Sequence, residues 1–567
     1  MNDLPRKSDF VVVGGVATGP KTAATLARRI PNAGITLFQR ESHLSYATCG
    51  FPFFASGELS SFDQLLQTGY GVTRDVEFFE QSKGFRAIPS SEVISINRQK
   101  KTVTVRMLQS GETFEHGYGR LVLATGATPN KPPMPVPDSD LIRPFTRPAD
   151  VINFRQLAQQ GKVDKVVIVG GGFVGIELCE AVRDTWGIEV KLFEKQPQLL
   201  PYMLDPEMAA ILQRSLVANG VDVLDNAEVE KIELDSDGKP VVFLQGLEPI
   251  STDYVFLCLG VRPEVTLAKE CGLDIGRTGG ILVDSFLQTS DADIFAGGDC
   301  VESFHRITKH RFYIPMGSLA NRHGRFIAEN LAGNKMEFPG VVGTFVLRAF
   351  DTNTGGVGLS ELVAKQEGLD VRTVWGSFPD RPDYMPEVKT FTLKMIYEEG
   401  SNRLLGLQAV GSGDICRRVD VFSSLLQREA ELEDLLDFEH GYAPPFAEAL
   451  DPLHHLAGIA LAEQRGTVFV EPKALEDHID DNTLLLDVRE TDEITNEPLP
   501  ADNMPTSCQV VAIPLNELRK RLDELDRNKR ILLVCRRGLR SYQAALILKA
   551  AGYKNVIVLA AGLQAQR

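Results

Sequence analysis

Two cysteines stand in sequence settings that could support sulfur chemistry. The first, Cys49, lies in the stretch SYATCGFPFF between small polar residues and a Gly-Phe-Pro run. The next cysteine along the chain is Cys179, so no partner for a local disulfide is close in sequence. A lone thiolate can cycle through sulfenic acid, form a mixed disulfide with a small thiol, or have a purely structural role. The residues around Cys49 leave all three roles open.

The second candidate, Cys535, opens a short loop in the stretch VCRRGLRS, after the apolar run RILLV and before the helix-forming run SYQAALILKAAG. Backbone N–H groups of such a loop converge on the sulfur, and nearby arginines and the helix N-terminus favour a negative charge on it. The cysteine loop of phosphatases, which ends in a comparable arginine, is one residue longer, so this spacing favours sulfane sulfur over phosphate. The residues expected around the sulfur are Arg536, Arg537, Gly538, Leu539 and Arg540.

Two segments follow the plan of a dinucleotide-binding unit, which would supply electrons to such thiols. Residues 10–30 and 165–182 each run from a β-branched strand through a glycine turn into a helix-forming stretch, and a second strand follows. Glycines let the backbone approach a pyrophosphate, and the helix N-terminus offers free N–H groups to its charge. The second copy is complete, and its carboxylate favours NADH because it would repel the 2′-phosphate of NADPH. Its residues are Gly170, Gly172, Gly175 and Glu194.

The first copy departs from the pattern, since Val16 stands where the middle glycine belongs and Gln39 where the acid is expected. Together with the strand-and-turn stretches LVLATGATPN (121–130) and DIFAGGDC (293–300), the two copies resemble the flavoprotein disulfide reductase superfamily over roughly the first 450 residues. The resemblance implies that the first unit holds FAD and the second NADH. It assigns to FAD the residues Gly14, Gly15, Gly19, Gln39, Arg40, Thr125, Gly126 and Asp299.

The same resemblance implies an α/β protein with two Rossmann-like nucleotide-binding domains and an α+β dimerisation domain. A fresh strand pattern, TLLLDVRE, begins a further C-terminal α/β unit that is similar to the rhodanese fold. We expect a discontinuous FAD domain at 1–150 and 251–335, an NADH domain at 151–250, a dimerisation domain at 336–460 and a rhodanese-like domain at 467–567.

The superfamily resemblance narrows the role of Cys49. Many members carry a second redox cysteine where this chain has Phe54, and the peroxidase branch carries a histidine in the first glycine turn, which reads GGVATG here. The cysteine motif and this turn instead resemble coenzyme A disulfide reductases, in which the cysteine forms a mixed disulfide with coenzyme A. That resemblance adds two catalytic tyrosines and three coenzyme A contacts, namely Tyr384, Tyr442, Arg28, Ser45 and Thr48.

Taken together, the motifs resemble coenzyme A disulfide reductases fused to a rhodanese domain. They predict an FAD enzyme that uses NADH to reduce coenzyme A persulfide, polysulfide or coenzyme A disulfide through Cys49, with Cys535 handling sulfane sulfur. Two alternatives stay open. One is an NADH oxidase without a sulfur substrate, and the other is a sulfur-carrier or redox-sensing protein.

The composition is that of an ordinary globular protein. The 567 residues are 43% hydrophobic and 24% charged, and the formal net charge of −16 disfavours nucleic acid as a partner. No apolar stretch is long enough to predict a membrane span, and no secretory signal is visible, so we expect a cytoplasmic protein. The resemblance implies a homodimer that acts on small thiols and persulfides. The eight cysteines contain no C-x-x-C pair, which predicts free thiols and no metal site.

Overall fold

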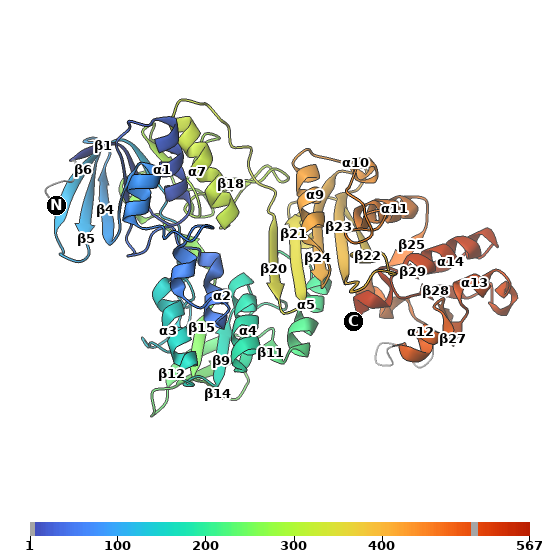
Figure 1. Cartoon of the computed structure of the whole chain (residues 1–567). Helices are drawn as coiled ribbons and strands as arrows, with labels where there is room; N and C mark the ends of the chain where they lie inside the picture. The colour runs from blue at the N-terminus through green and yellow to red at the C-terminus, as the bar shows by residue number, and fades with distance from the viewer. Residues whose placement is uncertain (1–5, 500–508, 567) are drawn as a thin grey trace. The chain divides into compact units, whose positions relative to one another are not determined.

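The computed structural model describes residues 6–499 and 509–566. The chain forms two compact units, Met1–Lys195 with Ala227–Val341 and Gln196–Asn226 with Val342–Arg567 (Figure 1). Each unit is built on sheets whose helices lie on their faces. Cys508, one of the eight cysteines, lies outside the described residues.

The first unit begins with a sheet whose strands lie in the order β3-β2-β1-β6-β5-β4, and β17 adds to β6. Its central strands are parallel and its β4–β5–β6 meander is antiparallel. The strands are β1 (Lys7–Val13), β2 (Ile35–Phe38), β3 (Arg86–Ile88), β4 (Ser91–Asn97), β5 (Thr102–Met107), β6 (Thr113–Leu123) and β17 (Ile294–Ala296). The helices that matter here are α1 (Thr18–Arg29), α2 (Phe51–Ser56) and α7 (Gly317–Leu331).

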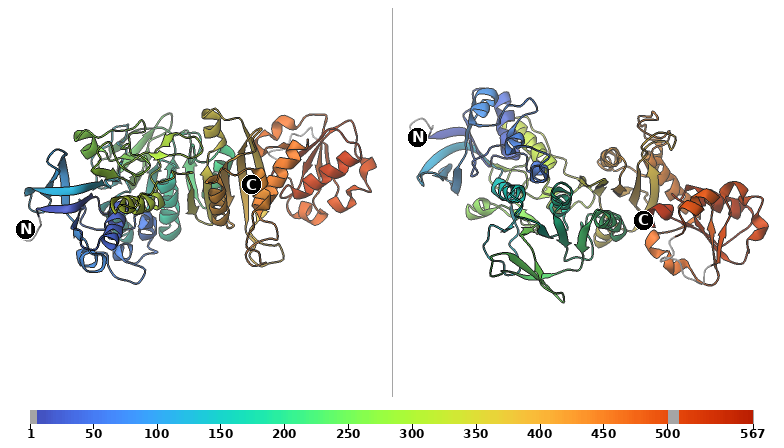
Figure 2. Two further views of the ribbon diagram at one scale, coloured as in Figure 1. Left: turned by 90° about the horizontal axis from the view of Figure 1, so that it is seen from above. Right: turned by 60° about the horizontal axis from the view of Figure 1, so that its bottom comes forward.

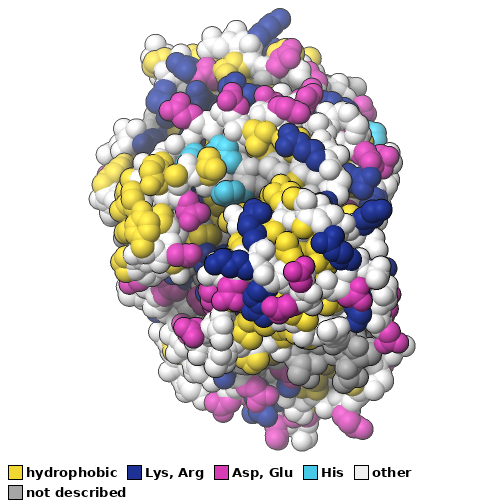
Figure 3. Space-filling model, turned by 90° about the vertical axis from the view of Figure 1, so that its right-hand side faces the viewer, with side chains coloured by type: hydrophobic (Ala, Val, Ile, Leu, Met, Phe, Trp, Pro, Cys, Tyr) yellow, Lys and Arg dark blue, Asp and Glu magenta, His cyan; other side chains and the backbone are white. Residues whose placement is uncertain are grey.

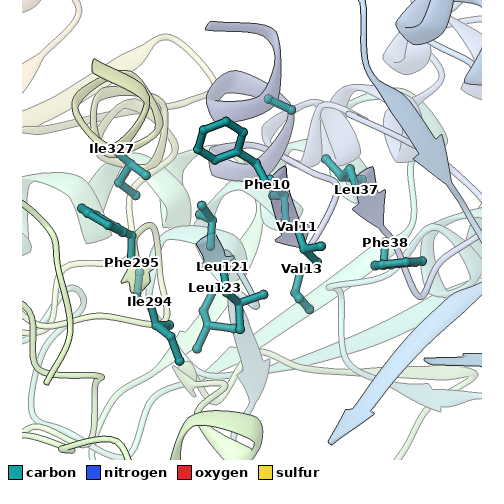
Figure 4. Packing of buried hydrophobic residues seen from close by; sticks show 14 of the residues in the cluster. Phe10, Val11, Val13, Leu37, Phe38, Leu121, Leu123, Ile294, Phe295 and Ile327 are labelled. Atoms are coloured by element: carbon teal, nitrogen blue, oxygen red, sulfur yellow. The ribbon is translucent and has the colours of Figure 1, made fainter. Parts of the chain in front are cut away.

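The core of this domain lies between the parallel strands and helices α1 and α7. Figure 4 shows side chains from β1, β2, β6 and β17 gathered with Ile327 of α7. Helices α1 and α7 lie in close contact. The Thr22 hydroxyl donates to the Gly324 carbonyl at 3.2 Å, and a Cβ at Gly324 would lie only 2.7 Å from the Thr18 carbonyl oxygen. This packing fixes where both helices begin relative to the strand ends, which is where ligands bind in open α/β sheets.

A second parallel sheet, with strands in the order β10-β9-β15-β8, completes the first unit. Its strands are near-continuous runs of Val, Ile, Leu and Phe, as expected where helices cover both faces. The elements are β8 (Ile142–Arg143), α3 (Pro148–Gln159), β9 (Lys165–Val169), α4 (Phe173–Trp186), β10 (Glu189–Phe193) and β15 (Tyr254–Leu257), with a small meander of β12 (Val229–Leu234), β13 (Pro240–Leu244) and β14 (Ile250–Ser251).

The second unit contains an antiparallel sheet in the order β20-β21-β24-β23-β22, covered by helices. The strands are β20 (Phe345–Ala349), β21 (Thr352–Gly358), β22 (Val371–Pro379), β23 (Thr390–Glu398) and β24 (Leu404–Gly411). The helices are α5 (Pro206–Ala218), α8 (Glu361–Gln366), α9 (Cys416–Leu426), α10 (Leu432–Asp437) and α11 (Pro452–Gln464).

The C-terminal part of the second unit is a parallel sheet in the order β25-β29-β28-β26-β27, drawn in orange to red in Figure 2. Alternate side chains of one strand enter different cores: Leu484 and Leu486 face α13 and α14, whereas Leu485 faces the short helical turns near the C-terminus. The elements are β25 (Val468–Val470), β26 (Thr483–Asp487), α12 (Thr491–Asn496), β27 (Gln509–Ala512), α13 (Leu515–Leu518), β28 (Arg530–Val534), α14 (Leu539–Ala550) and β29 (Val556–Leu559).

The α/β fold class predicted from the sequence is confirmed, with two Rossmann-like sheets, an antiparallel α+β domain and a C-terminal parallel α/β domain. Within the described ranges, no helix is both long and apolar enough to cross a membrane.

Candidate functional site

The first glycine turn joins β1 to α1 in a conformation that larger residues cannot adopt. Gly14 has φ +110°, and a Cβ at Gly19 would collide with the Gly14 carbonyl oxygen. Gln39, at the end of β2 and only 5% exposed, accepts a hydrogen bond from the Gly15 N–H at 2.9 Å through its side-chain oxygen. Gln39 therefore supports the turn from the position where an acid was expected, and the missing charge leaves this hydrogen bond intact.

A second group of polar residues follows β17 and β6, at the same end of the first sheet. Gly298 has φ +80°, and its N–H donates to His323 Nδ1 at 3.1 Å. Burial raises the pKa of Asp299 to about 6, and the Tyr313 hydroxyl is buried without a hydrogen-bond partner among the described residues. Burial, followed by the charge of Asp299, also raises the pKa of Tyr313. The unsatisfied Tyr313 hydroxyl and the nearby Asp299 carboxyl, which raises the pKa of Tyr313, fit a hydroxyl-rich ligand such as the ribityl chain of FAD.

Thr125 and Gly126, also assigned to FAD, form the turn after β6. The Thr125 hydroxyl donates to the Glu264 carbonyl at 2.6 Å, and Gly126 has φ +74°. Arg40 directly follows Gln39 and lies on the surface, 3.9 Å from Glu41. The predicted FAD residues therefore lie at the turns that follow four parallel strands of the same sheet, β1, β2, β6 and β17.

Cys49 is exposed and lies in a short helical turn, Thr48–Gly50, just before α2. Its segment is tied to the first glycine turn, because the Ser45 N–H donates to the Gly15 carbonyl at 2.7 Å. The Cys49 sulfur also lies beside the start of α7, since a Cβ built on Gly317 would be 3.8 Å from Sγ. The start of α7, which is the positive end of its helix dipole, therefore lies beside the thiol.

Two residues of the second sheet's helices hold the segment that follows Cys49. Arg155 of α3 is buried and donates to the carbonyls of Phe54 at 2.7 Å and of Leu59. Trp186 Nε1 of α4 donates to the Ala55 carbonyl at 2.8 Å. These groups hold the end of α2 through its carbonyls. Neither residue was predicted, because nothing in its local sequence pattern indicates a partner about 100 residues away.

The three residues predicted to contact coenzyme A occupy different settings. Thr48 and Cys49 are exposed neighbours, and the Ser45 hydroxyl lies 3.5 Å from Arg74 Nη1. Arg28 is exposed on α1, where it donates to the Thr25 hydroxyl of its own helix at 3.0 Å. The structure therefore places Ser45 and Thr48 in the same segment as Cys49, with a cation beside Ser45 that was not predicted.

The second glycine turn, between β9 and α4, repeats the geometry of the first. Gly170 has φ +112°, and a Cβ at Gly175 would collide with the Gly170 carbonyl oxygen. Gly172 precedes α4 and leaves open space above it. Glu194, 8% exposed, accepts from the Gly171 N–H at 2.7 Å, as Gln39 does from Gly15. This turn fits a dinucleotide, with a carboxylate at the position that meets a ribose.

Cys535 lies at the end of β28, in the loop that leads into α14. Its side chain is 1% exposed, and the Gly538 N–H donates to Sγ at 3.1 Å. Gly538 has φ +95°. A Cβ at Gly562 would lie 2.5 Å from the Cys535 carbonyl oxygen, so the Gly562 backbone packs tightly against the loop. Leu539, at the first position of α14, is 58% exposed. The predicted loop is thus formed, with a backbone donor directed at the sulfur.

Carboxylates surround the arginines near Cys535. Arg537 forms two 2.9 Å hydrogen bonds with Asp383, and Arg540 forms a bidentate pair with Glu493 that includes a 2.8 Å bond. Arg489 and Asp487, which match the early strand of the rhodanese fold, form a buried pair at 2.7 Å. Asp383 and Glu493 were not predicted, because each pairs with an arginine far away in the sequence and looks there like any exposed acid.

The two predicted tyrosines lie close together in the second unit. Both are exposed, and partial desolvation, followed by the nearby Tyr442 and its hydrogen bond, raises the pKa of Tyr384. Asp383, which binds Arg537, is the residue before Tyr384. The tyrosine pair therefore lies in the same neighbourhood as the loop of Cys535.

Comparisons with known proteins agree with this architecture. Residues 8–316 match the pyridine nucleotide-disulphide oxidoreductase family, residues 347–454 its dimerisation domain, and residues 471–566 the rhodanese-like domain. The chain is 32% identical over 460 residues to an NAD(P)H coenzyme A polysulfide/persulfide reductase of Pyrococcus horikoshii, covering 80% of this chain and 98% of that protein.

Two solved structures resemble the chain over nearly its whole length. A NAD-dependent persulfide reductase from A. fulgidus is 35% identical with a TM-score of 0.92, covering 98% of this chain and all of that one. The reduced CoADR-RHD of Bacillus anthracis is 31% identical with a TM-score of 0.89, covering 99% of this chain and 97% of that one. The chain belongs to the pyridine nucleotide-disulphide oxidoreductase family and carries its dimerisation domain and a C-terminal rhodanese-like domain.

Proposed function

We propose that the protein is an FAD-dependent reductase that uses NADH to reduce coenzyme A persulfide, polysulfide or coenzyme A disulfide through Cys49. The observation that carries the proposal is the position of the Cys49 sulfur, beside the start of α7 and tied through Ser45 to the first glycine turn. The names of the Pyrococcus and A. fulgidus proteins support the same substrate class.

The residues that fit FAD are those of the first glycine turn, the turn after β6 and Asp299, and Gly170, Gly172, Gly175 and Glu194 fit NADH. When bound, FAD accepts a hydride from NADH and supplies two electrons to a sulfur–sulfur bond. The backbone N–H groups of the glycine turns would orient the two nucleotides, and Cys49 lies beside the start of α7. The buried Asp299 and Tyr313 offer hydrogen bonds to hydroxyls.

The sulfur chemistry at Cys49 needs no second cysteine of this chain. The Cys49 thiolate attacks the coenzyme A sulfur of CoA–S–SH, the S–S bond breaks, and hydrosulfide leaves with the bonding pair. Two electrons from NADH then split the mixed disulfide, which restores the Cys49 thiolate and releases coenzyme A. The balance is NADH, a proton and CoA–S–SH giving NAD⁺, CoA–SH and H₂S.

The remaining predicted residues have roles around this step. The Tyr384 and Tyr442 hydroxyls would donate hydrogen bonds to the departing thiolate, and Arg28, Ser45 and Thr48 would contact coenzyme A. Tyrosine can serve either as such a donor or as a general acid. The dimerisation domain supports a homodimer as the working form.

Cys535 would accept or deliver a sulfane sulfur, which links the rhodanese-like domain to the reductase. The Gly538 N–H stabilises negative charge on that sulfur. This proposal places the enzyme in the cytoplasm, where both thiols stay reduced.

The test is anaerobic NADH oxidation by the purified protein with coenzyme A persulfide, coenzyme A disulfide and polysulfide, repeated for Cys49→Ser and Cys535→Ser. We expect Cys49→Ser to abolish all three activities while the bound flavin is still reduced by NADH. Cys535→Ser should lose activity only with substrates whose sulfur passes through the rhodanese-like domain.

Two outcomes would favour the alternatives. Rapid oxygen consumption that is indifferent to coenzyme A thiols and persists in Cys49→Ser would indicate an NADH oxidase. Sulfur transfer at Cys535 with negligible steady-state NADH turnover would indicate a sulfur carrier or sensor.

A further inference from the structure

The loop of Cys535 carries three arginines, but carboxylates already neutralise two of them. Arg537 is held by Asp383 and Arg540 by Glu493, each through two guanidinium nitrogens. Bidentate pairs of this kind are the strong form of the arginine–carboxylate interaction. For Arg536, no carboxylate lies within ion-pair distance in the part of the chain that the structure describes.

The Glu493 carboxylate is charged at physiological pH. The hydrogen bond with Arg540 lowers the pKa of Glu493 to about 2, although partial burial opposes the shift. The Asp383 carboxylate is 66% exposed in its side chain and forms an ion pair with Arg537 at 2.9 Å. Three guanidinium and two carboxylate charges therefore leave the surroundings of the sulfur with a net charge of only +1.

A further acid lies in the same electrostatic neighbourhood. Burial, followed by the charge of Asp383, raises the pKa of Glu448, which also interacts with Arg537. Figure 3 shows basic and acidic side chains interspersed on one face of the molecule. The loop thus lies in a nearly balanced field instead of a strongly positive one.

This balance decides which sulfur donor suits the loop. Thiosulfate brings two negative charges to the sulfur. Both charges are attracted by the loop arginines and repelled by Asp383 and Glu493. A thiol persulfide brings a single charge on its terminal sulfur, which the Gly538 N–H and the remaining positive charge can match. We infer that Asp383 and Glu493 are specificity-determining residues that make Cys535 accept sulfur from thiol persulfides and disfavour thiosulfate.

The inference deepens the proposed function and rests on it for the role of Cys535 as a sulfur carrier. In the transfer, the Cys535 thiolate attacks the terminal sulfur of the protonated persulfide CoA–S–SH, the S–S bond breaks, and coenzyme A leaves as the thiolate CoA–S⁻ while the proton stays on the transferred sulfur. Cys535 then holds the sulfur as a persulfide. No electrons are gained or lost overall, so the step needs neither NADH nor FAD.

The experiment measures loading of Cys535 in the full-length protein without NADH. The donors are coenzyme A persulfide and thiosulfate, and the readout is one added sulfur on the peptide that contains Cys535, followed over time by mass spectrometry. The variants are Asp383→Asn and Glu493→Gln. The matched control is Glu524→Gln, which removes a carboxylate paired with Arg521 on the surface of the same domain.

We expect wild-type protein to load at least about tenfold faster from coenzyme A persulfide than from thiosulfate. Because Asp383 is mostly exposed, its charge is partly screened, and we expect Asp383→Asn to raise the thiosulfate rate about fivefold at low salt. Glu493→Gln should act in the same direction. Neither variant should change the persulfide rate more than about twofold, and Glu524→Gln should change neither rate, since a distant charge is screened.

Three results would overturn the inference. They are equal loading from both donors, no loading from either donor, and an unchanged ratio of the two loading rates in both Asp383→Asn and Glu493→Gln. The proposed function is tested separately by NADH oxidation. A protein that reduces coenzyme A persulfide with NADH but loads Cys535 equally from both donors keeps the proposed function and loses the inference. A protein that loads Cys535 selectively from the persulfide but does not oxidise NADH keeps the inference about the two carboxylates and loses the proposed reductase function.

Discussion

Replacement of Lys394 by methionine is expected to destabilise the second unit strongly. Lys394 lies in β23 with no exposed side-chain surface, and its ammonium contacts Asp205 at 2.8 Å and Glu207 and Glu361 at 2.6 Å. Burial alone would lower the pKa of Lys394, but the three carboxylates raise it above its usual range. The lysine is therefore charged in the folded protein and balances a cluster of acids.

The size of the effect follows from what the variant leaves behind. Methionine fills similar volume, but the carboxylates stay in place with oxygens within 4.8 Å of one another. Removing one partner from a buried ionic group costs about 3–5 kcal/mol. We expect the lower end, about 3 kcal/mol, because Glu361 keeps Lys365 and Asp205 keeps the Gln408 amide at 2.7 Å. That corresponds to a fall in melting temperature of roughly 6–12 °C.

The assay is thermal and urea unfolding at pH 7.5, with Lys365→Met as control. Lys365 is 59% exposed and also pairs with Glu361, so its loss should cost only about 0.5 kcal/mol. The deficit of Lys394→Met should shrink as the pH falls. Burial raises the pKa of Glu361 and Lys394 lowers it, so the variant removes a charge that keeps this carboxyl ionised. A loss of stability no larger than that of Lys365→Met would refute the reasoning.

Two further predictions concern stability against pH and nucleotide binding. Burial, opposed by Arg372, raises the pKa of Glu463 to about 7, so its ionisation costs folding free energy as the pH rises from its ordinary pKa of 4.5 through 7. Glu463→Gln should therefore stabilise the protein at pH 8 by up to about 3 kcal/mol and by little below pH 5, as measured by urea unfolding; a pH-independent gain would contradict this. Gly175→Val should weaken NADH binding at least about tenfold, because its Cβ meets the Gly170 carbonyl, and should leave the flavin content unchanged. Titration of flavin reduction by NADH measures the affinity, and the absorbance spectrum measures the flavin content. Normal NADH affinity in the variant would count against this turn as the NADH site.

Features encoded within one short segment could be predicted from the sequence. The two glycine turns, with Gln39 and Glu194 bonding the second glycine N–H of each, are local to a strand–turn–helix–strand unit. The loop of Cys535 is also local, since a strand, a glycine with positive φ and a helix follow one another directly. Local geometry of this kind depends on residues a few positions apart.

Contacts between distant segments could not be predicted. Arg155, which holds the segment after Cys49, and Lys394, which gathers three acids, give no local signal because charged residues are usually on the surface. The sequence predicted that the loop arginines favour a negative charge on the sulfur. It gave no sign that two of them pair with Asp383 and Glu493.

The most direct test of the account is the covalent state of Cys49 during turnover. The protein, with its flavin oxidised and Cys49 as a free thiol, is mixed anaerobically with coenzyme A persulfide. Samples taken before and after NADH is added are quenched with acid, and the Cys49 peptide is analysed by mass spectrometry. We predict a Cys49–coenzyme A mixed disulfide that forms before NADH and disappears with it. An unmodified Cys49 throughout, while NADH is still consumed and H₂S is released, would contradict the account.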